Sequence, residues 1–186
     1  MKSFIDYLTE ATTLKIMMIG GPGSGKSTYS KAISKHYDIP HIYAGDILRK
    51  SEDPEVKALL SKGELAPLDV TLKLIKAEIS KATDGYILDG FPRTMEQLKE
   101  MQKANIELNC VVYLDVSDAE VLRRLSARGR ADDKPEIIKN RIKVYEKETG
   151  PVVDFYRDKS EFLSVKAEGD TAENISKKII QMLDKG

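Results

Sequence analysis

The sequence predicts a single α/β domain in which helices cover both faces of a parallel sheet. Three observations support this fold class. Short apolar runs alternate with helical segments, a glycine-rich loop joins the first apolar run to a helix, and a later apolar run ends in an acidic residue. At 186 residues, the chain has the usual length of one domain.

Apolar runs and breaker residues give the expected elements in order. Strands are predicted over 14–19, 38–44, 86–89, 111–116 and 162–165. Helices are predicted over 28–37, 45–49, 55–62, 69–82, 94–103, 118–128, 137–147, 152–159 and 171–183. Gly63 is expected to end its helix as a C-cap, and Gly150-Pro151 to break the chain between two helices.

The glycine-rich loop fits the pattern G-x-x-x-x-G-K-[ST], with Gly20, Gly25, Lys26 and Ser27 at the fixed positions. A strand before it and a helix after it are the context that a phosphate-binding loop requires. Backbone N–H groups would converge on phosphate oxygens, Lys26 would reach the β- and γ-phosphates, and the Ser27 hydroxyl would ligate Mg²⁺. The chain is therefore predicted to bind a nucleoside triphosphate.

Other charged residues supply what phosphate chemistry needs. Asp89 ends an apolar run and is expected to hold Mg²⁺ or its water shell. Arginine grips phosphate oxygens with two bonds and stays charged. The candidate arginines are Arg49, Arg93, Arg124, Arg128, Arg130 and Arg141. Arg124 and Arg141 equally fit a solvated helix face, whereas residues 128–133, two arginines around a glycine followed by two aspartates, suggest a mobile flap with internal ion pairs.

Composition excludes several other classes of protein. Thirty basic residues balance thirty acidic ones, so no polycationic field points to nucleic acid as a partner. The single cysteine, Cys110, rules out an intrachain disulfide and a cysteine-rich zinc site. No run approaches the roughly 18 apolar residues of a membrane span, and the start lacks a secretory signal, so the cytoplasm is expected. His36 and His41 are expected to be structural or exposed.

Residues 1–11 form an N-terminal extension before the first strand. Phe4, Ile5 and Leu8 would form one face of a short helix packed on the core. The segment also resembles the capsid-targeting peptides of tailed bacteriophages, which are cut after a Leu-x-Glu pattern such as Leu8-Thr9-Glu10. If the protein is viral, residues 1–10 would direct it into the virion head. A floppy terminus is the third alternative.

The motifs together resemble those of the nucleoside monophosphate kinases, and within them adenylate kinase in its short-lid form. The resemblance runs from about 14 to 183. It rests on the segments 20–28, 41–49, 63–67, 89–93 and 128–133, on Gln97 and on Arg141. It implies a three-layer P-loop α/β/α fold with a five-stranded parallel sheet, and a monomer. The implied core is 12–42, 73–124 and 135–186, with a helical monophosphate-binding subdomain over 43–72 and a very short lid over 125–134.

The resemblance also implies the reaction and the residues that serve it. Mg-ATP and AMP would give two ADP, reversibly, without zinc. The implied catalytic residues are Lys26, Arg93, Arg128, Arg130 and Arg141. ATP would meet Gly21, Gly23, Ser24, Gly25, Lys26, Ser27, Thr28, Arg128, Gly169 and Arg124, which would stack on adenine. AMP would meet Ala44, Gly45, Arg49, Glu64, Leu65, Ala66, Gly90, Arg93, Gln97, Arg130 and Arg141. Ser27 and Asp89 would hold Mg²⁺, partly through water.

Three departures from the family pattern affect the expected substrate or the closure of the site. Ala44 replaces the usual threonine and matches UMP/CMP kinases, whereas Gln97 matches adenylate kinases, since UMP/CMP kinases carry asparagine there. We expect AMP to be preferred with relaxed discrimination; a UMP/CMP or broad-specificity kinase is the alternative. Tyr43 replaces a small serine and is expected to narrow the site mouth. Only Gly129 separates Arg128 from Arg130, so the lid is expected to seal the site poorly and permit ATP hydrolysis.

A non-catalytic nucleotide-binding protein is a third reading. The presence of Lys26, Asp89, Arg93 and the lid arginines disfavours it.

Overall fold

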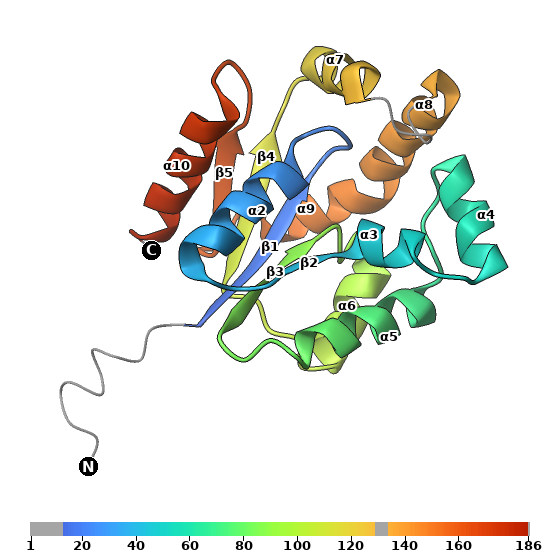
Figure 1. Ribbon diagram of the computed structural model, residues 1–186, viewed down its shortest axis with the longest axis horizontal. Coiled ribbons are helices and arrows are strands. Elements are labelled where there is room, and N and C mark those ends of the chain that lie inside the picture. Colours follow the sequence, from blue (N-terminus) through green and yellow to red (C-terminus); the bar gives the residue numbers. More distant parts are fainter. Residues whose placement is uncertain (1–12, 129–133, 186) are drawn as a thin grey trace.

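A computed structural model describes residues 13–128 and 134–185, with the backbone alone at Arg128. Five parallel strands form one sheet in the order β2-β3-β1-β4-β5 (Figure 1). The strands are β1 (Leu14–Gly20), β2 (His41–Tyr43), β3 (Gly85–Asp89), β4 (Cys110–Asp115) and β5 (Phe162–Lys166). The predicted α/β fold and its five-stranded parallel sheet are confirmed.

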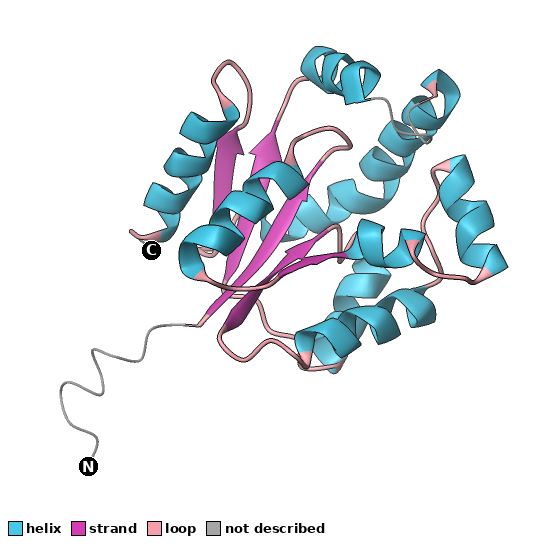
Figure 2. Ribbon diagram, viewed as in Figure 1, coloured by secondary structure: helices cyan, strands magenta, loops and turns pink. Residues whose placement is uncertain are grey.

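Helices surround the sheet (Figure 2). They are α2 (Lys26–Tyr37), α3 (Ala44–Arg49), α4 (Pro54–Lys62), α5 (Leu68–Ile79), α6 (Met95–Lys103), α7 (Asp118–Arg128), α8 (Pro135–Val144), the π-helical turn η1 (Tyr145–Thr149), α9 (Gly150–Arg157) and α10 (Ala172–Leu183). No helix within 13–128 or 134–185 is long and apolar enough to cross a membrane. The N-terminal extension, 1–11, lies outside the described residues.

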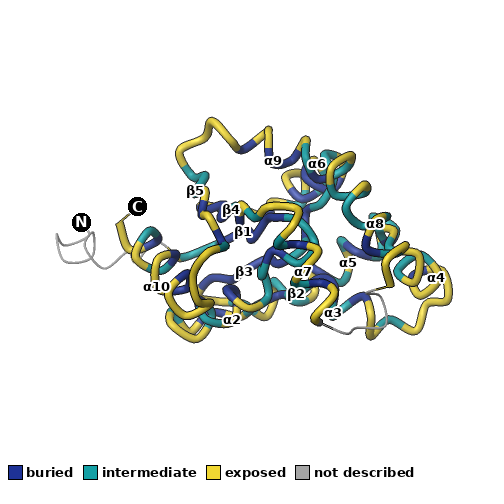
Figure 3. Tube along the Cα trace, turned by 90° about the horizontal axis from the view of Figure 1, so that it is seen from above, coloured by how far each residue is buried: buried dark blue, intermediate teal, exposed yellow. Residues whose placement is uncertain are grey.

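Each face of the sheet has its own apolar core, and both cores lie along the central strands (Figure 3). One core joins α2 and α10 to the sheet through residues such as Ile33 and Ile179. The other joins α5, α6 and α9 to the opposite face, with Leu98 and Val152 fully buried. Side chains of successive strand residues point to opposite faces, so a strand covered on both sides reads as a continuous apolar run.

The central position of β1 determines where a ligand can bind. β1 pairs with β3 on one side and β4 on the other, so the chain leaves β1 at the point where the strand order reverses. In open α/β sheets, ligands bind outside the carboxyl ends of the strands at such a point. The register pairs Met18 with Asp89, which brings the end of β3 beside the glycine-rich loop.

A small separate core holds the helical arm formed by α3, α4 and the start of α5. Leu48, Val56 and Ala66 are its buried residues. The Asp53 side chain caps α4 by accepting the Glu55 N–H at 2.8 Å. Gly63 ends α4 with φ 77°, which confirms the predicted C-cap.

This arm also contacts α8. The Asn140 side-chain amide donates to the Lys62 carbonyl at 2.7 Å. A Cβ atom at Gly63 would lie 2.8 Å from the Arg141 side chain, so the C-cap of α4 fits closely against that helix. The contact brings Arg141 to the arm.

The predicted break at Gly150-Pro151 is wrong. Helical structure runs from α8 through η1 into α9 without interruption. The π-helical turn places Pro151 in the first turn of α9, where a missing N–H costs no hydrogen bond of that helix. The predicted start of α2 at residue 28 and strand at 38–44 also differ: α2 begins at Lys26, and Asp38 is its left-handed C-cap.

Candidate active site

A cleft of about 680 Å³ opens at the carboxyl edge of the sheet. It is lined by the glycine-rich loop, the helical arm, the loop after β3 and parts of α7 and α8. Most of the residues predicted from the sequence line it. These are Gly23, Gly25, Lys26, Ser27, Thr28, Gly45, Arg49, Glu64, Leu65, Ala66, Asp89, Gly90, Arg93, Gln97, Arg124 and Arg141. Segments that lie far apart in the chain, from Gly23 to Arg141, therefore meet at one site.

Four other predicted residues do not line this cleft. Gly21 and Ser24 belong to the loop itself, and Gly169 lines a shallow hollow beside it. Ala44 is 1% exposed, and its methyl group packs into the core under α3. Arg130 and the Arg128 side chain lie outside the described residues.

The glycine-rich loop has the backbone geometry that its sequence predicts. Gly25 has φ 96° as the N-cap of α2, and a Cβ atom there would lie 2.6 Å from the Tyr29 ring. Only glycine fits this position. Because α2 begins at Lys26, the N-terminal end of this helix and its partial positive charge lie at the cleft. The Lys26 ammonium donates to the carbonyls of Gly20 and Gly21, at 2.6 and 2.8 Å.

Asp89 is fully buried at the end of β3 and contacts two side chains. Its Oδ2 accepts the Ser27 hydroxyl at 2.6 Å and lies 3.1 Å from His41 Nε2. A carboxylate only accepts, so the imidazole carries its proton on Nε2. Burial raises the pKa of Asp89, but the His41 hydrogen bond, the Lys26 charge and the Ser27 hydrogen bond outweigh it and hold that pKa below its ordinary value.

The residues around Asp89 fit a divalent cation. Its second oxygen, Oδ1, is buried and has no hydrogen-bond partner among the described residues. An ionised carboxylate oxygen without a partner is costly in a protein interior unless a cation or its water shell satisfies it. The Ser27 hydroxyl, bonded to the other oxygen, supplies a second hard ligand of the type that Mg²⁺ prefers.

The loop after Asp89 is held by hydrogen bonds on both sides of Arg93. Arg93 Nε donates to the Gly90 carbonyl at 2.7 Å, and the guanidinium packs so closely that a Cβ atom at Gly90 would lie 2.6 Å from Nη2. The Gln97 amide oxygen accepts the Arg93 N–H at 2.7 Å, and the Thr149 hydroxyl donates to the Arg93 carbonyl at 2.9 Å. Burial lowers the pKa of Arg93, although nearby Asp89 opposes this.

Tyr43 organises the opposite wall of the cleft. Its hydroxyl accepts from the Arg49 guanidinium at 2.9 Å, and that guanidinium lies 5.2 Å above its ring. The ring stacks on His41 at 5.9 Å and covers Gly45, where a Cβ atom would lie 2.9 Å away. Tyr43 thus lines the cleft and holds Arg49, whereas the narrowing of the site mouth stays a prediction.

Several residues of the site carried no functional signal in the sequence. His41 was expected to be structural or exposed, yet it contacts Asp89, because β2 pairs with β3. His36, in contrast, is exposed, as expected. Thr149 and Tyr145 reach the cleft through the π-helical turn, and Tyr145 lies against Gly21. Cys110 is buried with its pKa raised to about 12, so it is an apolar side chain.

Comparisons with known proteins agree with this geometry. The adenylate kinase family model matches residues 18–161. The adenylate kinase of Corynebacterium diphtheriae is 39% identical over 184 residues, covering 92% of this chain and 100% of that protein. That of Mycolicibacterium smegmatis is 41% identical over 157 residues, covering 78% and 87%. That of Prochlorococcus marinus is 34% identical over 165 residues, covering 83% and 90%.

A phosphate-binding loop, a buried acid beside it and arginines across one cleft fit a nucleoside monophosphate kinase, and the relatives show that the chain is such a phosphotransferase. Within that class, the chain belongs to the adenylate kinase family.

Proposed function

We propose that this protein transfers the γ-phosphoryl group of ATP to AMP, giving two ADP in a reversible reaction. The observation that carries the proposal is the meeting of Lys26, from the phosphate-binding loop, with Asp89 and Arg93, from the end of β3 and the loop after it, in one cleft. An oxygen of the AMP phosphate forms a bond to the γ-phosphorus, and the bond from that phosphorus to the β,γ-bridging oxygen breaks. No protein nucleophile is needed, because positioning and charge stabilisation supply the catalysis.

The proposed roles follow from where the cations lie. Lys26, at the start of α2, would exchange the Gly20 and Gly21 carbonyls for the β- and γ-phosphates of ATP. Arg49, Arg93 and Arg141, from the arm, the loop after β3 and α8, would hold the AMP phosphate and the transferred group. From the family resemblance, Arg128 and Arg130 would join them.

Magnesium would be held by Ser27 and, partly through water, by Asp89. When bound, it neutralises charge on the β- and γ-phosphates. Asp89 holds no proton at neutral pH because its pKa is low, so it is a ready ligand.

Residues 43–72 are proposed as the monophosphate-binding subdomain, residues 125–134 as the short lid and the remainder of 12–186 as the core. The separate small core of Leu48, Val56 and Ala66 supports the first assignment. An arm with its own core can move as a unit, and its closure over both nucleotides would exclude water from the transfer.

The proposed preference for AMP depends on Gln97. Gln97 lines the cleft, and its amide orientation is set by the bond from the Arg93 N–H. It retains an NH₂ donor and one acceptor lone pair for the adenine edge. Ala44 packs into the core instead and does not line the cleft. Gln97 is therefore the better indicator of which monophosphate is preferred, and it indicates AMP.

Initial rates with Mg-ATP and, separately, AMP, CMP, UMP, dAMP and GMP test the proposal. AMP is expected to have the highest kcat/KM. Gln97→Asn should lower that value for AMP by on the order of tenfold, the effect of losing one buried hydrogen bond to the base. Ala44→Thr is the matched control and should leave the order of substrates unchanged.

Equal or higher kcat/KM with CMP or UMP would show a pyrimidine or broad-specificity kinase. Absence of ADP formation with every monophosphate would indicate a nucleotide-binding protein without catalysis.

A further inference from the structure

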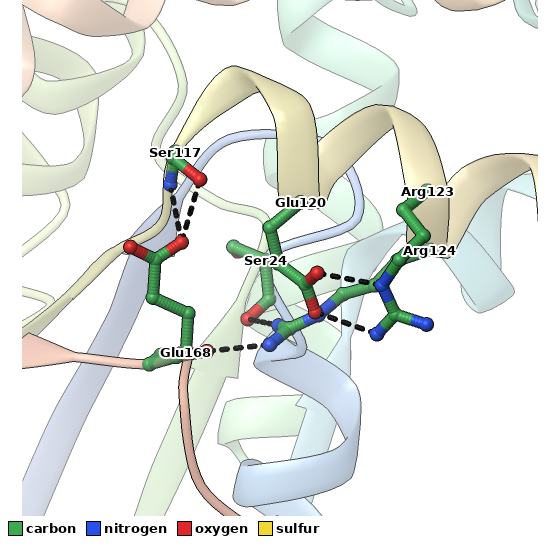
Figure 4. A network of polar contacts seen from close by, with 7 residues as sticks. Ser24, Ser117, Glu120, Arg123, Arg124 and Glu168 are labelled. Carbon is green, nitrogen blue, oxygen red and sulfur yellow. Dashed lines mark hydrogen bonds and ion pairs between the residues drawn. The ribbon is translucent and has the colours of Figure 1, made fainter.

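A network of polar contacts surrounds the start of α7, beside the phosphate-binding loop (Figure 4). We call it the α7 network. It joins three parts of the chain: the phosphate-binding loop, α7 with the residue before it, and the segment after β5. Its members are Ser24, Ser117, Glu120, Arg123, Arg124, Ala167 and Glu168.

Arg124 is the centre of the α7 network, and each of its side-chain nitrogens donates to a different acceptor. Nε donates to Glu120 Oε1 at 2.7 Å. Nη1 donates to the Ser24 carbonyl at 3.2 Å, and Nη2 to the Ala167 carbonyl at 2.6 Å. These three acceptors lie around the edge of the guanidinium plane, because its N–H bonds lie in that plane. The plane is thereby fixed to three elements at once.

An arginine whose side-chain nitrogens already donate to protein acceptors is suited to a different contact from one whose N–H groups face a ligand. A phosphate-gripping arginine presents its N–H groups to the phosphate oxygens. Arg124 has committed its nitrogens to protein acceptors, yet its side chain is 22% exposed and lines the cleft. The flat face of the guanidinium is not used by these three bonds, and such a face stacks well on an aromatic base.

The position of Arg124 beside the phosphate-binding loop indicates which nucleotide would supply the base. The Ser24 carbonyl that holds Arg124 belongs to the phosphate-binding loop, and Ala172 and Asp170, just after the Ala167 segment, also line the cleft. We infer that Glu120 is a positioning residue which, with the two carbonyls, fixes Arg124 as a stacking platform for the base of the nucleotide bound by the phosphate loop. The inference rests on the proposed function, which makes that nucleotide ATP.

Glu120 is well suited to this role. Its carboxylate receives Arg124 on one side and Arg123 on the other, where Arg123 Nε lies 2.6 Å from Oε2. Hydrogen bonds from Arg123 and Arg124 lower the pKa of Glu120 to about 2, so the carboxylate is ionised at any working pH. Arg123 is 69% exposed, and ion pairs of such exposed groups contribute little. Of the two contacts of Glu120, the one with Arg124 is therefore the one that fixes a side chain lining the cleft.

Glu168 strengthens the α7 network at the residue that precedes α7. Its Oε2 accepts both the N–H and the hydroxyl of Ser117, at 3.0 and 2.7 Å. This ties the residue before α7 to the segment that provides the Ala167 carbonyl. The acceptors of Arg124 thus keep their places relative to α7.

The test compares ATP with inorganic tripolyphosphate, which carries the phosphates without the base. Calorimetric Kd values for both would be measured on the wild-type protein, Glu120→Ala, Arg124→Ala and the double variant. Arg123→Ala is the matched control, because it removes the other partner of the same carboxylate. KM for ATP, KM for AMP, kcat and Tm are measured alongside.

Glu120→Ala is expected to raise the Kd and KM of ATP about fivefold, a part of the effect of losing one stacked base. Its Kd for tripolyphosphate, its kcat and its KM for AMP should stay within twofold. Arg124→Ala should show the same pattern more strongly, and the double variant should be no worse than Arg124→Ala alone. Arg123→Ala should match the wild-type protein.

Three results would overturn the inference. If Arg124→Ala weakened the binding of ATP and of tripolyphosphate equally, Arg124 would contact the phosphates and not the base. Unchanged ATP binding in Glu120→Ala, or additive effects of the two variants, would reduce Glu120 to a surface ion pair. A wild-type protein that binds ATP but forms no ADP from ATP and AMP would contradict the proposed function instead, and the calorimetric comparison would still decide the role of Glu120.

Discussion

The phosphate-loop side and the arm side of the cleft hold their cations in different ways. On the phosphate-loop side, Lys26 and Arg124 are bound by backbone carbonyls of elements that belong to the central sheet and its loops. On the arm side, Arg49 is exposed, and Tyr43 is its side-chain partner among the described residues. Tyr43 in turn stacks on His41 and covers Gly45 in the first turn of α3.

This difference separates two tasks. Lys26, which would act on the transferred phosphoryl group, is held by two carbonyls of the phosphate-binding loop, which keeps it pre-organised. Arg49, which would hold the phosphate of the monophosphate, is carried on an arm with three buried apolar residues of its own. A change at Lys26 should therefore act on turnover, a change at Arg124 on the KM for ATP, and a change at Arg49 or Tyr43 on the KM for AMP.

Removing the ammonium on the phosphate-loop side should have the largest effect. Lys26→Met is expected to lower kcat by about 10³-fold, because charge stabilisation in the transition state is the main catalytic contribution. Initial rates with saturating ATP and AMP measure this. Lys31→Met, at an exposed position of the same helix, is the control and should retain full activity. A merely modest loss in Lys26→Met would contradict the assigned role of Lys26.

Neutralising the buried acid should have the next largest effect. Asp89→Asn is expected to lower kcat by about 10²-fold, since it removes the charge that faces the expected Mg²⁺ site. Its apparent affinity for Mg²⁺, from a magnesium titration of the rate, should fall as well. Asp84→Asn, an exposed aspartate just before β3, serves as the control. An unchanged magnesium dependence in Asp89→Asn would remove Asp89 from the metal site.

On the arm side, Tyr43→Phe should raise the KM for AMP and leave the KM for ATP unchanged. Without the hydroxyl, Arg49 must be ordered on binding at a cost of about 0.5–1.5 kcal/mol, which corresponds to a roughly twofold to tenfold rise in KM for AMP. CMP should be affected equally, because the phosphate rather than the base is involved. A lower KM for AMP in this variant would mean that the phenol competes with the phosphate for Arg49.

The smallest effect expected is a pH dependence of stability from Asp89. Its pKa in the folded protein lies below its ordinary value, so its ionised form stabilises the fold above that ordinary value. This contribution is lost as the pH falls through the lowered pKa. Urea unfolding at pH 7, 5 and 3 should show wild type more stable than Asp89→Asn by about 1–3 kcal/mol at pH 7, with the difference shrinking at pH 3. A constant difference would exclude Asp89 as its source.

Motif and periodicity were enough to predict the strands, most helices and most of the cleft lining. The phosphate loop is defined locally, because Gly25 must adopt a left-handed conformation and the helix must start directly after it. The sequence also predicted the Gly63 C-cap for the same local reason. It failed at Gly150-Pro151, where a π-helical turn absorbs a proline that usually ends a helix.

What the sequence alone determined is the class of the protein: the parallel sheet, the phosphate loop and the acid at the end of β3 each follow from patterns of a few consecutive residues. Tertiary structure decided which side chains complete the site. His41 reaches Asp89 through the pairing of β2 with β3, Thr149 reaches Arg93 across 56 residues, and Glu120 matters because Arg124 meets carbonyls from two distant segments. Contacts between residues far apart in the chain leave no periodic signal, so packing alone reveals them.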